Sequence, residues 1–338
     1  MQSTEDFQAT SGSGISSAVP IQFLELANAH NRHENSDQKS PGSVDLVSDL
    51  SKVTTQTTLV KCKGQEVKIH AVQTGMVAVK RSHLTDRTAH FLTPIKISLD
   101  RRFTQFLPIW VWVIEHPEGV IVIDTGENAE VVNSDYFAPA GKLVAAYSKR
   151  NLKFNINKEN EIGFQLHQLG IAQESIKNVV LTHLHLDHTD GIKDFPNVEI
   201  LISDAEYKHP SGHLPQLLPS WFNPKRVTYK KDMISVFNKA YPITDAEDVL
   251  LVPTGGHTKH HASVLFKTDS FDILFAGDVS YTQEQLLQGD IAGINANYKE
   301  SKRTYDTIKT YAKHQKLIFL PSHDLNATNR LINRIFLC

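Results

Sequence analysis

The run of residues 182–188 contains the side chains with the clearest chemical potential in this chain. Three histidines and one aspartate lie within six positions, directly after a short apolar run. Imidazole and carboxylate groups are the ligands that suit zinc and similar divalent ions. In an extended segment His183 and His185 point the same way, whereas the adjacent polar pair Asp187 and His188 requires a turn. One strand end and one turn can therefore serve two neighbouring metal ions.

Three further candidate ligands each follow an apolar segment that is typical of a buried strand. His257 follows the segment 249–252, Asp278 follows 271–275 and His323 follows 317–320. Rigid scaffolds present functional groups on the loops at strand ends. The seven candidate metal ligands are therefore His183, His185, Asp187, His188, His257, Asp278 and His323. This set suits two ions, with three imidazoles on one, two imidazoles and Asp187 on the other, and Asp278 bridging them.

Two simpler interpretations compete with a two-metal centre. His257 or His323 alone could be an ordinary residue near a turn, but four potential ligands in one short run are hard to explain in that way. A single structural zinc site is the other alternative. Structural sites favour cysteine and are closed by four ligands, whereas this chain has seven candidates and no cysteine beside them.

The composition excludes several classes of protein. The chain has 338 residues, 40% of them hydrophobic, which suits one large α/β domain or two smaller ones. Its 35 basic and 37 acidic side chains give a net charge of −2, so no basic excess indicates a nucleic-acid partner. Cys62 and Cys338 are the only cysteines and form no disulfide framework, which favours a cytosolic protein with free thiols.

The N-terminal part differs in composition from the rest. Residues 1–60 are rich in Ser, Thr, Gln, Asn and Asp, and we expect a flexible extension in which only 21–27 could form a short helix. A single domain is expected over 61–338. The start of the chain lacks the pattern of a signal peptide, and no window approaches the ~20 apolar residues of a membrane span. We therefore expect a cytoplasmic protein with no membrane partner.

Strand and helix patterns alternate along the domain in two successive halves. The expected strands are 67–72, 108–114, 119–123, 178–181, 198–202, 249–252, 262–267, 271–275 and 317–320. The expected helices are 162–169, one that begins at 203–206, and 299–313. Residues 76–106 show no regular pattern. This order predicts an α/β protein, an αββα sandwich in which two mixed sheets pack face to face with helices outside.

The ligand pattern resembles that of the metallo-β-lactamase superfamily. The His-x-His-x-Asp-His run, a later Gly-His and a still later Gly-Asp occur in the order and rough spacing of its dinuclear hydrolases. Within that branch the chain is most similar to the N-acyl-homoserine lactonases, the quorum-quenching enzymes. The stretches that carry this similarity are 107–110, 123–126, 182–188, 278–282 and 291–293, together with 322–324. Two turns depart from the family pattern, with Asp190-Gly191 in place of Gly-Gly, and residues 259–261 in place of Pro-Gly-His.

The resemblance implies a carboxylic ester hydrolase that opens the ring of N-acyl-homoserine lactones or similar lactones by attack of a metal-bridging hydroxide. Its cofactor would be two divalent metal ions, with zinc as the first choice and Fe, Mn or Co as alternatives. Its partner would be a small lactone substrate, and the protein could form a homodimer. Tyr281 would donate a hydrogen bond to the oxyanion, and Asp187 would be both ligand and proton shuttle. Asp124 would orient a histidine. Trp110 and Trp112 could face an acyl pocket, but core packing is the stronger expectation.

Other activities of the superfamily stay open as alternatives. Thioesterases of the hydroxyacylglutathione type and phosphotriesterases share the ligand set, and a persulfide dioxygenase would use one iron and leave His188 or His323 free. A non-catalytic binding protein with the same fold is disfavoured because the ligand set is complete. The context of Ser280, Tyr281 and Thr282 favours the lactonases among these classes.

Overall fold

The computed structural model describes residues 55–85, 93–231 and 236–338. Of the extension predicted over 1–60, residues 1–54 lie outside the described residues. The helix predicted at 21–27 lies there as well. The described chain begins with strand β1 (Thr55–Cys62). The predicted domain boundary at residue 60 therefore falls inside a strand.

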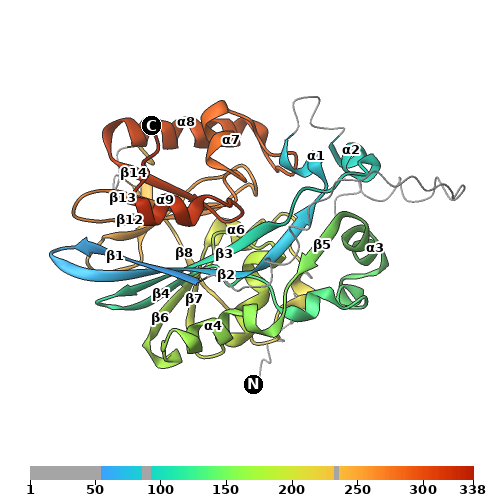
Figure 1. Cartoon of the computed structure of the whole chain (residues 1–338), viewed down its shortest axis with the longest axis horizontal. Helices are drawn as coiled ribbons and strands as arrows, with labels where there is room; N and C mark the ends of the chain where they lie inside the picture. Colours follow the sequence, from blue (N-terminus) through green and yellow to red (C-terminus); the bar gives the residue numbers. More distant parts are fainter. Residues whose placement is uncertain (1–54, 86–92, 232–235) are drawn as a thin grey trace, which may run out of the picture. The chain divides into compact units, whose positions relative to one another are not determined.

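Two mixed sheets make up the strands of the described residues (Figure 1). The first has the order β1, β2 (Gln65–Val79), β3 (Leu107–His116), β4 (Gly119–Ile123), β6 (Ile176–Val180), β7 (Glu199–Ser203) and β8 (Lys225–Val227), with β5 (Leu152–Asn155) paired to β2. The second has the order β14 (Leu317–Pro321), β13 (Asp272–Gly277), β12 (Ala262–Lys267), β11 (Val249–Pro253), β10 (Lys239–Pro242) and β9 (Lys230–Lys231). The predicted pair of mixed sheets is confirmed.

The α-helices of the described residues are mostly short. They are α1 (Arg81–Leu84), α2 (Thr93–Leu99), α3 (Lys142–Asn151), α4 (Ile162–Gln168), α5 (Leu186–Thr189), α6 (Asp204–Lys208), α7 (Gln283–Gln288), α8 (Tyr298–His314) and α9 (Ala327–Asn333). None of these helices is both long and apolar enough to cross a membrane. The longest helix is α8, and Asn297 directly precedes it. The Asn297 side chain accepts the backbone N–H of Glu300 and so caps the helix.

Strand β3 shows why the central strands have continuous apolar sequences. Trp112 and Ile114 face the core between the two sheets, where Trp112 packs 5.5 Å from the ring of Phe275 in β13. Val111 and Val113 face the opposite side, towards α4. Successive side chains of a strand point to opposite faces, so a strand that is covered on both faces is apolar throughout.

The outer layers complete the sandwich. Ile162 and Leu166 of α4 share a core with the first sheet. Leu286 of α7 and Ile308 of α8 share a core with the second sheet. Helices therefore cover the outer face of each sheet, and the predicted αββα architecture is confirmed.

The prediction for residues 76–106 was wrong in part. Strand β2 continues to Val79, and α1 and α2 lie within this stretch. The register between β2 and β3 shifts between Gln73 and Met76, which is a β-bulge. Such a bulge breaks the alternation of apolar and polar residues on which strand prediction depends, although the strand itself continues.

Trp112 tests the importance of the core between the sheets. We expect Trp112→Ala to lower the free energy of unfolding by about 3–5 kcal/mol, because the side chain is fully buried. Trp221→Ala is the matched control, since Trp221 is 41% exposed, and it should change stability by about 0.5 kcal/mol or less. Chemical denaturation of the two variants measures both values. Equal losses would contradict the assignment of Trp112 to the main core.

Candidate functional site

Four strand ends meet at one edge of the two sheets and carry all the predicted ligands. Residues 183–188 follow β6 and run into α5, His257 follows β11, Asp278 follows β13 and His323 follows β14. Backbone hydrogen bonds join the sheets at this edge, from Ala262 N–H to the carbonyl of Thr182 (2.9 Å) and from Trp110 N–H to the carbonyl of Ser322 (2.9 Å). The loops from both sheets are thereby held together.

The seven predicted ligands form two adjacent clusters. The first contains His183, His185, His257 and Asp278, and the second contains Asp187, His188 and His323. Within each cluster the potential ligand atoms lie within 4.8 Å of one another. In the first cluster, Nδ1 of His185 lies 2.9 Å from Nε2 of His257. This division into two groups is the one predicted for two ions.

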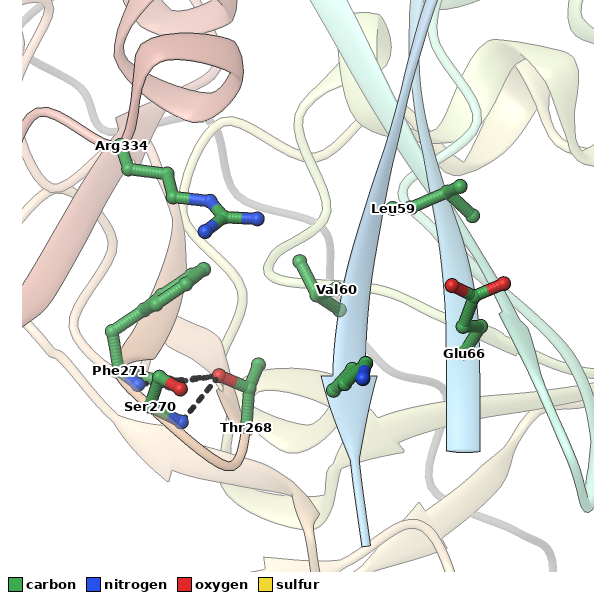
Figure 2. Close-up of a pocket in the computed structure, with 8 residues that line it drawn as sticks. Leu59, Val60, Glu66, Thr268, Ser270, Phe271 and Arg334 are labelled. Carbon is green, nitrogen blue, oxygen red and sulfur yellow. Dashed lines mark hydrogen bonds between the residues drawn. The ribbon is translucent and has the colours of Figure 1, made fainter. Parts of the chain in front are cut away.

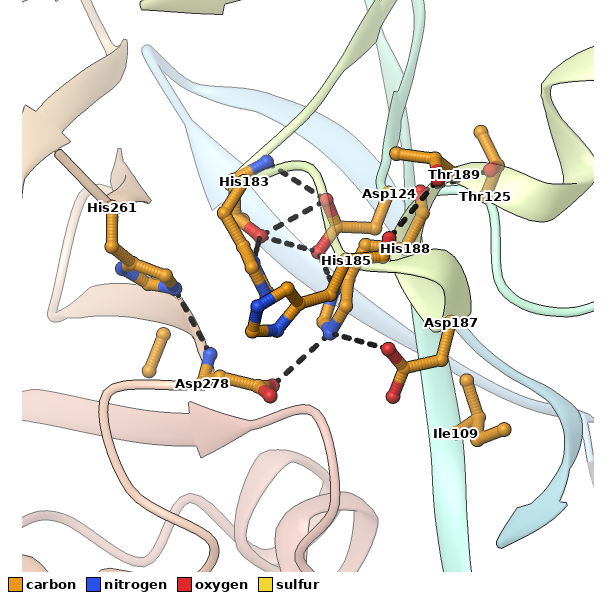
Figure 3. Close-up of polar contacts among 12 residues, drawn as sticks. Ile109, Asp124, Thr125, His183, His185, Asp187, His188, Thr189, His261 and Asp278 are labelled. Atoms are coloured by element: carbon orange, nitrogen blue, oxygen red, sulfur yellow. Dashed lines mark hydrogen bonds and ion pairs between the residues drawn. The ribbon is translucent and has the colours of Figure 1, made fainter. Parts of the chain in front are cut away.

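Asp278 connects the clusters through its two carboxylate oxygens. Its Oδ2 lies 3.3 Å from Nε2 of His257 in the first cluster. Its Oδ1 lies 3.2 Å from Nε2 of His188 and 3.5 Å from Nε2 of His323 in the second. Figure 3 shows this carboxylate pointing towards His188. Asp278 therefore lies between the two clusters and contacts histidines of both.

The first cluster consists largely of neutral imidazoles. Burial lowers the pKa of His183 well below its usual value, and burial together with His257 lowers the pKa of His185 to about 3. Burial also lowers the pKa of His257. Neutral imidazoles keep the lone pairs that a metal ion needs. The buried Nε2 of His183 has no hydrogen-bond partner among the described residues, as expected of a ligand atom.

The second cluster has an excess of negative charge that favours a cation. Although burial opposes the charged form, the carboxylates of Asp278 and Asp187 raise the pKa of His323 to about 10. Burial likewise opposes a charge on His188, but Asp278 and Asp124 raise its pKa well above the usual value. Protons on these imidazoles take the electrostatic place of a bound cation. The donor set of both clusters therefore fits divalent metal ions.

Asp124 holds one of these ligands in place. Its Oδ2 lies 2.8 Å from Nδ1 of His188, and its Oδ1 accepts the backbone N–H of Thr182 at 2.8 Å (Figure 3). Asp124 has φ 60°, a left-handed conformation that Asp tolerates better than most residues. A carboxylate at Nδ1 leaves Nε2 of His188 directed at the cluster. The predicted role of Asp124 in orienting a histidine agrees with this geometry.

The turn after the metal run differs from the family pattern at Asp190. The buried Asp190 carboxylate accepts the backbone N–H of Asn128 at 3.1 Å and the hydroxyl of Tyr136. Burial raises the pKa of Asp190, and burial together with Asp190 raises that of Glu127 well above its usual value. The next residue, Gly191, is needed for close packing, because a Cβ there would lie 2.2 Å from the carbonyl oxygen of Thr125. Asp190 thus ties the loop after Asp124 to the metal run.

Glu206 is a supporting residue that the sequence analysis identified only as part of a helix cap. It is fully buried at the start of α6, and its Oε2 accepts the hydroxyl of Thr258 at 2.8 Å. Burial raises the pKa of Glu206 to about 7, against the lowering effect of Thr258 and of nearby backbone N–H groups. The hydrogen bond connects α6 with the loop that carries His257. On the other side of this loop, a Cβ at Gly256 would lie 2.6 Å from the Cα of Ser301, so α8 packs directly on its backbone.

His261 is a second supporting residue that was missed. It is fully buried, and its Nε2 accepts the backbone N–H of Asp278 at 3.1 Å (Figure 3). Since Nε2 accepts a hydrogen bond, Nδ1 carries the proton and donates to Oγ1 of Thr254 at 2.9 Å. Burial lowers the pKa of His261 well below its usual value and so keeps the ring neutral. Its partner, the backbone N–H of Asp278, lies 17 residues further along the chain, so no local pattern in the sequence links the two.

Tyr281 lies beside the second cluster. Its ring centroid is 5.5 Å from that of His323, and its side chain packs with Leu107 and Ala292. Burial and the charge of Asp278 raise the pKa of Tyr281 well above 10, so its hydroxyl keeps its proton. The predicted hydrogen-bond donor is therefore protonated and close to the ligands.

A buried ion pair supports both Tyr281 and His323. Arg330 Nη2 lies 2.6 Å from Oδ2 of Asp324, the residue after His323. The same oxygen accepts the backbone N–H of Gln283, two residues after Tyr281, at 2.9 Å. Asp324 thus joins the loop after β14 to the start of α7.

Other candidate residues lie away from the ligands. Trp110 and Trp112 belong to the core between the sheets, which agrees with the stronger of the two expectations for them. A surface pocket of about 250 Å³ lies between β1 and the turn before β13 and is lined by Val60, Phe271 and Arg334 among others (Figure 2). None of the predicted site residues lines it. The chemistry is therefore concentrated at the two clusters.

The protein belongs to the metallo-beta-lactamase superfamily, whose family model matches residues 104–312. It is 26% identical over 220 residues to an N-acyl homoserine lactonase of Bacillus sp, which covers 65% of this chain and 82% of that protein. It is 27% identical over 232 residues to the N-acyl homoserine lactonase AttM of Agrobacterium fabrum, with 65% and 83% of the two chains covered.

A solved N-acyl homoserine lactone hydrolase, with the product N-hexanoyl-L-homoserine at its catalytic metal centre, matches with a TM-score of 0.63. The match has 21% sequence identity and covers 80% of this chain and 96% of that one. At this identity the likeness shows the fold. Together with the two clusters, the family match identifies the chain as a metallo-β-lactamase-type hydrolase whose ligands are consistent with a dinuclear metal centre.

The ion pair between Arg330 and Asp324 is open to a stability test. We expect Arg330→Met to lower the free energy of unfolding by about 3–5 kcal/mol, because it leaves the Asp324 carboxylate buried without its partner. The double variant Arg330→Met, Asp324→Asn should regain a large part of this loss. Arg303→Met removes an exposed ion pair with Glu300 and should cost less than about 1 kcal/mol. A loss in Arg330→Met no larger than in this control would contradict the supporting role.

Proposed function

We propose that this protein opens the lactone ring of N-acyl-homoserine lactones or closely related lactones by hydrolysis. The observation that carries this proposal is the protonated Tyr281 beside a complete pair of metal-ligand clusters. The curated relatives named above are N-acyl homoserine lactonases, which supports the same substrate class. Among the alternatives, the context of Ser280, Tyr281 and Thr282 resembles the lactonases more than the thioesterases or the phosphotriesterases.

We assign zinc as the first choice of metal, with Fe, Mn or Co as alternatives. His183, His185 and His257 would hold one ion, His188, His323 and Asp187 the other, and Asp278 would bridge them. The set contains imidazole and carboxylate but no thiolate, which suits zinc without excluding the other ions. When bound, two such ions supply Lewis acidity and lower the pKa of water at the site towards ~7.

The side chains of the protein perform the remaining steps. Tyr281 donates a hydrogen bond to the carbonyl oxygen as negative charge develops on it during attack by water. In the metal-free protein, although burial opposes it, the charges of His188 and His323 lower the pKa of Asp187 to about 2, and a cation in their place would likewise keep the carboxylate ionised. Asp187 receives the proton of the attacking water and passes it to the ring oxygen that leaves. The single product is the opened N-acyl homoserine, whose new hydroxyl group carries that proton and whose carboxyl group ionises by releasing the second proton of the water to solvent.

A substrate panel tests the proposal directly. Purified protein, reconstituted in turn with Zn, Mn, Co and Fe, is offered homoserine lactones of several acyl lengths, simple lactones, thioesters and phosphotriesters. We expect the highest kcat/KM on a homoserine lactone. Preferred hydrolysis of a thioester or a phosphotriester would replace the proposed substrate class by that alternative. Oxygen uptake with glutathione persulfide by an iron form would replace it by a dioxygenase.

The Asp124→Asn variant tests the two-ion assignment. The amide cannot accept a hydrogen bond through its nitrogen, so His188 loses the partner that directs its Nε2 at the second cluster. We expect the affinity for the second ion to fall by about 10- to 100-fold while the first ion is retained. Elemental analysis and chelator competition measure this, with Asp135→Asn, an exposed position in the same connection, as the control. Fewer than one equivalent of metal in reconstituted wild type would overturn the dinuclear assignment.

The Tyr281→Phe variant tests the hydrogen-bond donor. Loss of one donor to a developing oxyanion lowers kcat by about 100-fold or more. We expect this loss without a change in metal content, because Tyr281 belongs to neither ligand cluster. Tyr298→Phe, at an exposed position of α8, should leave the rate unchanged. A lactonase rate in Tyr281→Phe within about twofold of wild type would remove Tyr281 from the mechanism.

A further inference from the structure

An exposed basic face lies beside the candidate site. We define it by six side chains from α1 to β5, all of them exposed: Arg81, Arg102, Lys142, Lys149, Arg150 and Lys153. In the described residues 79–85, 93–103 and 142–155 the sequence has nine Lys or Arg and one acidic residue. The whole chain has a net charge of −2, so this concentration of positive charge is local.

Contacts among these segments show that the basic face is continuous. Phe103 lies at its centre, with Nζ of Lys80 at 3.7 Å and Nζ of Lys153 at 4.4 Å from its ring centroid. Arg81 Nε donates to the carbonyl of Phe103, and Arg150 Nη2 donates to the carbonyl of Ser98 at 2.8 Å. Figure 1 shows α1, α2 and α3 near the end of the paired strands β2 and β5.

The single acidic residue of these segments does not neutralise the face. Asp100 accepts the backbone N–H groups of Ser82 and Arg102, both at 3.0 Å, and lies 3.7 Å from the guanidinium of Arg102. Its carboxylate is thus committed to fixing the end of α2 against α1. The other five side chains that define the basic face are exposed.

Two leucines lie exposed within the basic face. Leu99, at the end of α2, is 72% exposed, and Leu143, at the start of α3, is 51% exposed. Leu143 and Arg150 are seven residues apart and therefore lie on the same side of α3, about 10 Å from each other along the helix axis. Arg150 in turn contacts Ser98, next to Leu99. The leucines thus belong to the same surface as the cations.

We propose that this basic face docks the protein on the surface of an anionic phospholipid bilayer. Lys and Arg side chains are attracted to anionic headgroups, and apolar side chains between them gain by entering the headgroup boundary. A nucleic acid would match the charge but would leave Leu99 and Leu143 in water. This peripheral contact needs no membrane-spanning helix, and it differs from the sequence-based expectation of no membrane partner.

The basic face lies close to the candidate site, so docking would affect access of substrate to that site. Leu84, at the end of α1, packs against the cluster of Leu107, Tyr281 and Ala292, and Gly293 N–H donates to the carbonyl of His83 at 2.8 Å. The helix that carries Arg81 therefore also packs against the cluster that contains Tyr281, the side chain proposed to act on substrate. Docking would bring the catalytic site near lipid, where a substrate with an acyl chain concentrates. This purpose rests on the proposed function, whereas the docking itself does not.

Vesicle sedimentation of the full chain tests the proposal without measuring hydrolysis. We expect binding to vesicles of phosphatidylcholine mixed with phosphatidylglycerol, little binding to phosphatidylcholine alone, and release by salt. Neutralising Lys142, Lys149 and Lys153 together to Gln should weaken binding by roughly 100-fold, at about fivefold for each lysine. The matched control neutralises Lys299, Lys302 and Lys313, three exposed lysines of α8, and should keep most of the binding.

A double variant separates the apolar contribution of the basic face from its charge. Leu99→Ser with Leu143→Ser removes the apolar contact but no charge, and should weaken vesicle binding by about tenfold. Four results would overturn the proposal: no binding of wild type to the anionic vesicles, equal binding to both vesicle types, an equal loss in the α8 control, or binding to RNA but not to vesicles. Since hydrolysis is not the readout, failure here leaves the proposed function untouched, and failure of the lactone panel leaves this test valid.

Discussion

Seven ionisable side chains, five of them buried and two partly buried, meet at one edge of the two sheets, and this is the constraint that the rest of the structure satisfies. A buried carboxylate is costly unless a positive charge or hydrogen bonds compensate it. Asp187 and Asp278 face each other across His188 and His323, and both histidines are driven towards the charged form by them. Such an arrangement has a clear use where divalent cations replace the protons, and little use in a purely structural core.

The same constraint explains why the supporting residues lie behind the ligands. A ligand loop must hold its imidazole in one orientation, and each loop here is fixed from a different element. Asp124 fixes His188 from the end of β4, and His261 fixes the backbone of Asp278 from the start of β12. Asp324 and Arg330 fix the loop of His323 from α9. The residues that support the ligands are as deeply buried as the ligands themselves, so a change in any of them alters the site indirectly.

The sequence predicted the parts that depend on short-range patterns. The ligands, the strands that precede them and the αββα layers follow from apolar runs that end in His or Asp. The extension of β2 to Val79 was missed because the bulge after Gln73 interrupts its alternation. Glu206 and His261 were missed for a different reason, since their partners, Thr258 and the backbone of Asp278, lie far enough along the chain that no local pattern links them.

The departures from the family pattern show which residues near such a site can change. The turn after His257 has Lys259 and His260 where relatives have Pro and Gly, yet His261 still reaches Asp278 because the turn is fixed at both ends, by α8 at Gly256 and by β12. Asp190 replaces a glycine but turns its charge inward to Asn128 and Tyr136. Metal chemistry constrains the ligands and their supports, whereas α1, α2 and α3 are free of that constraint. Leu84 of α1 packs against the cluster that contains Tyr281, so changes in this helix would reach the site through that contact.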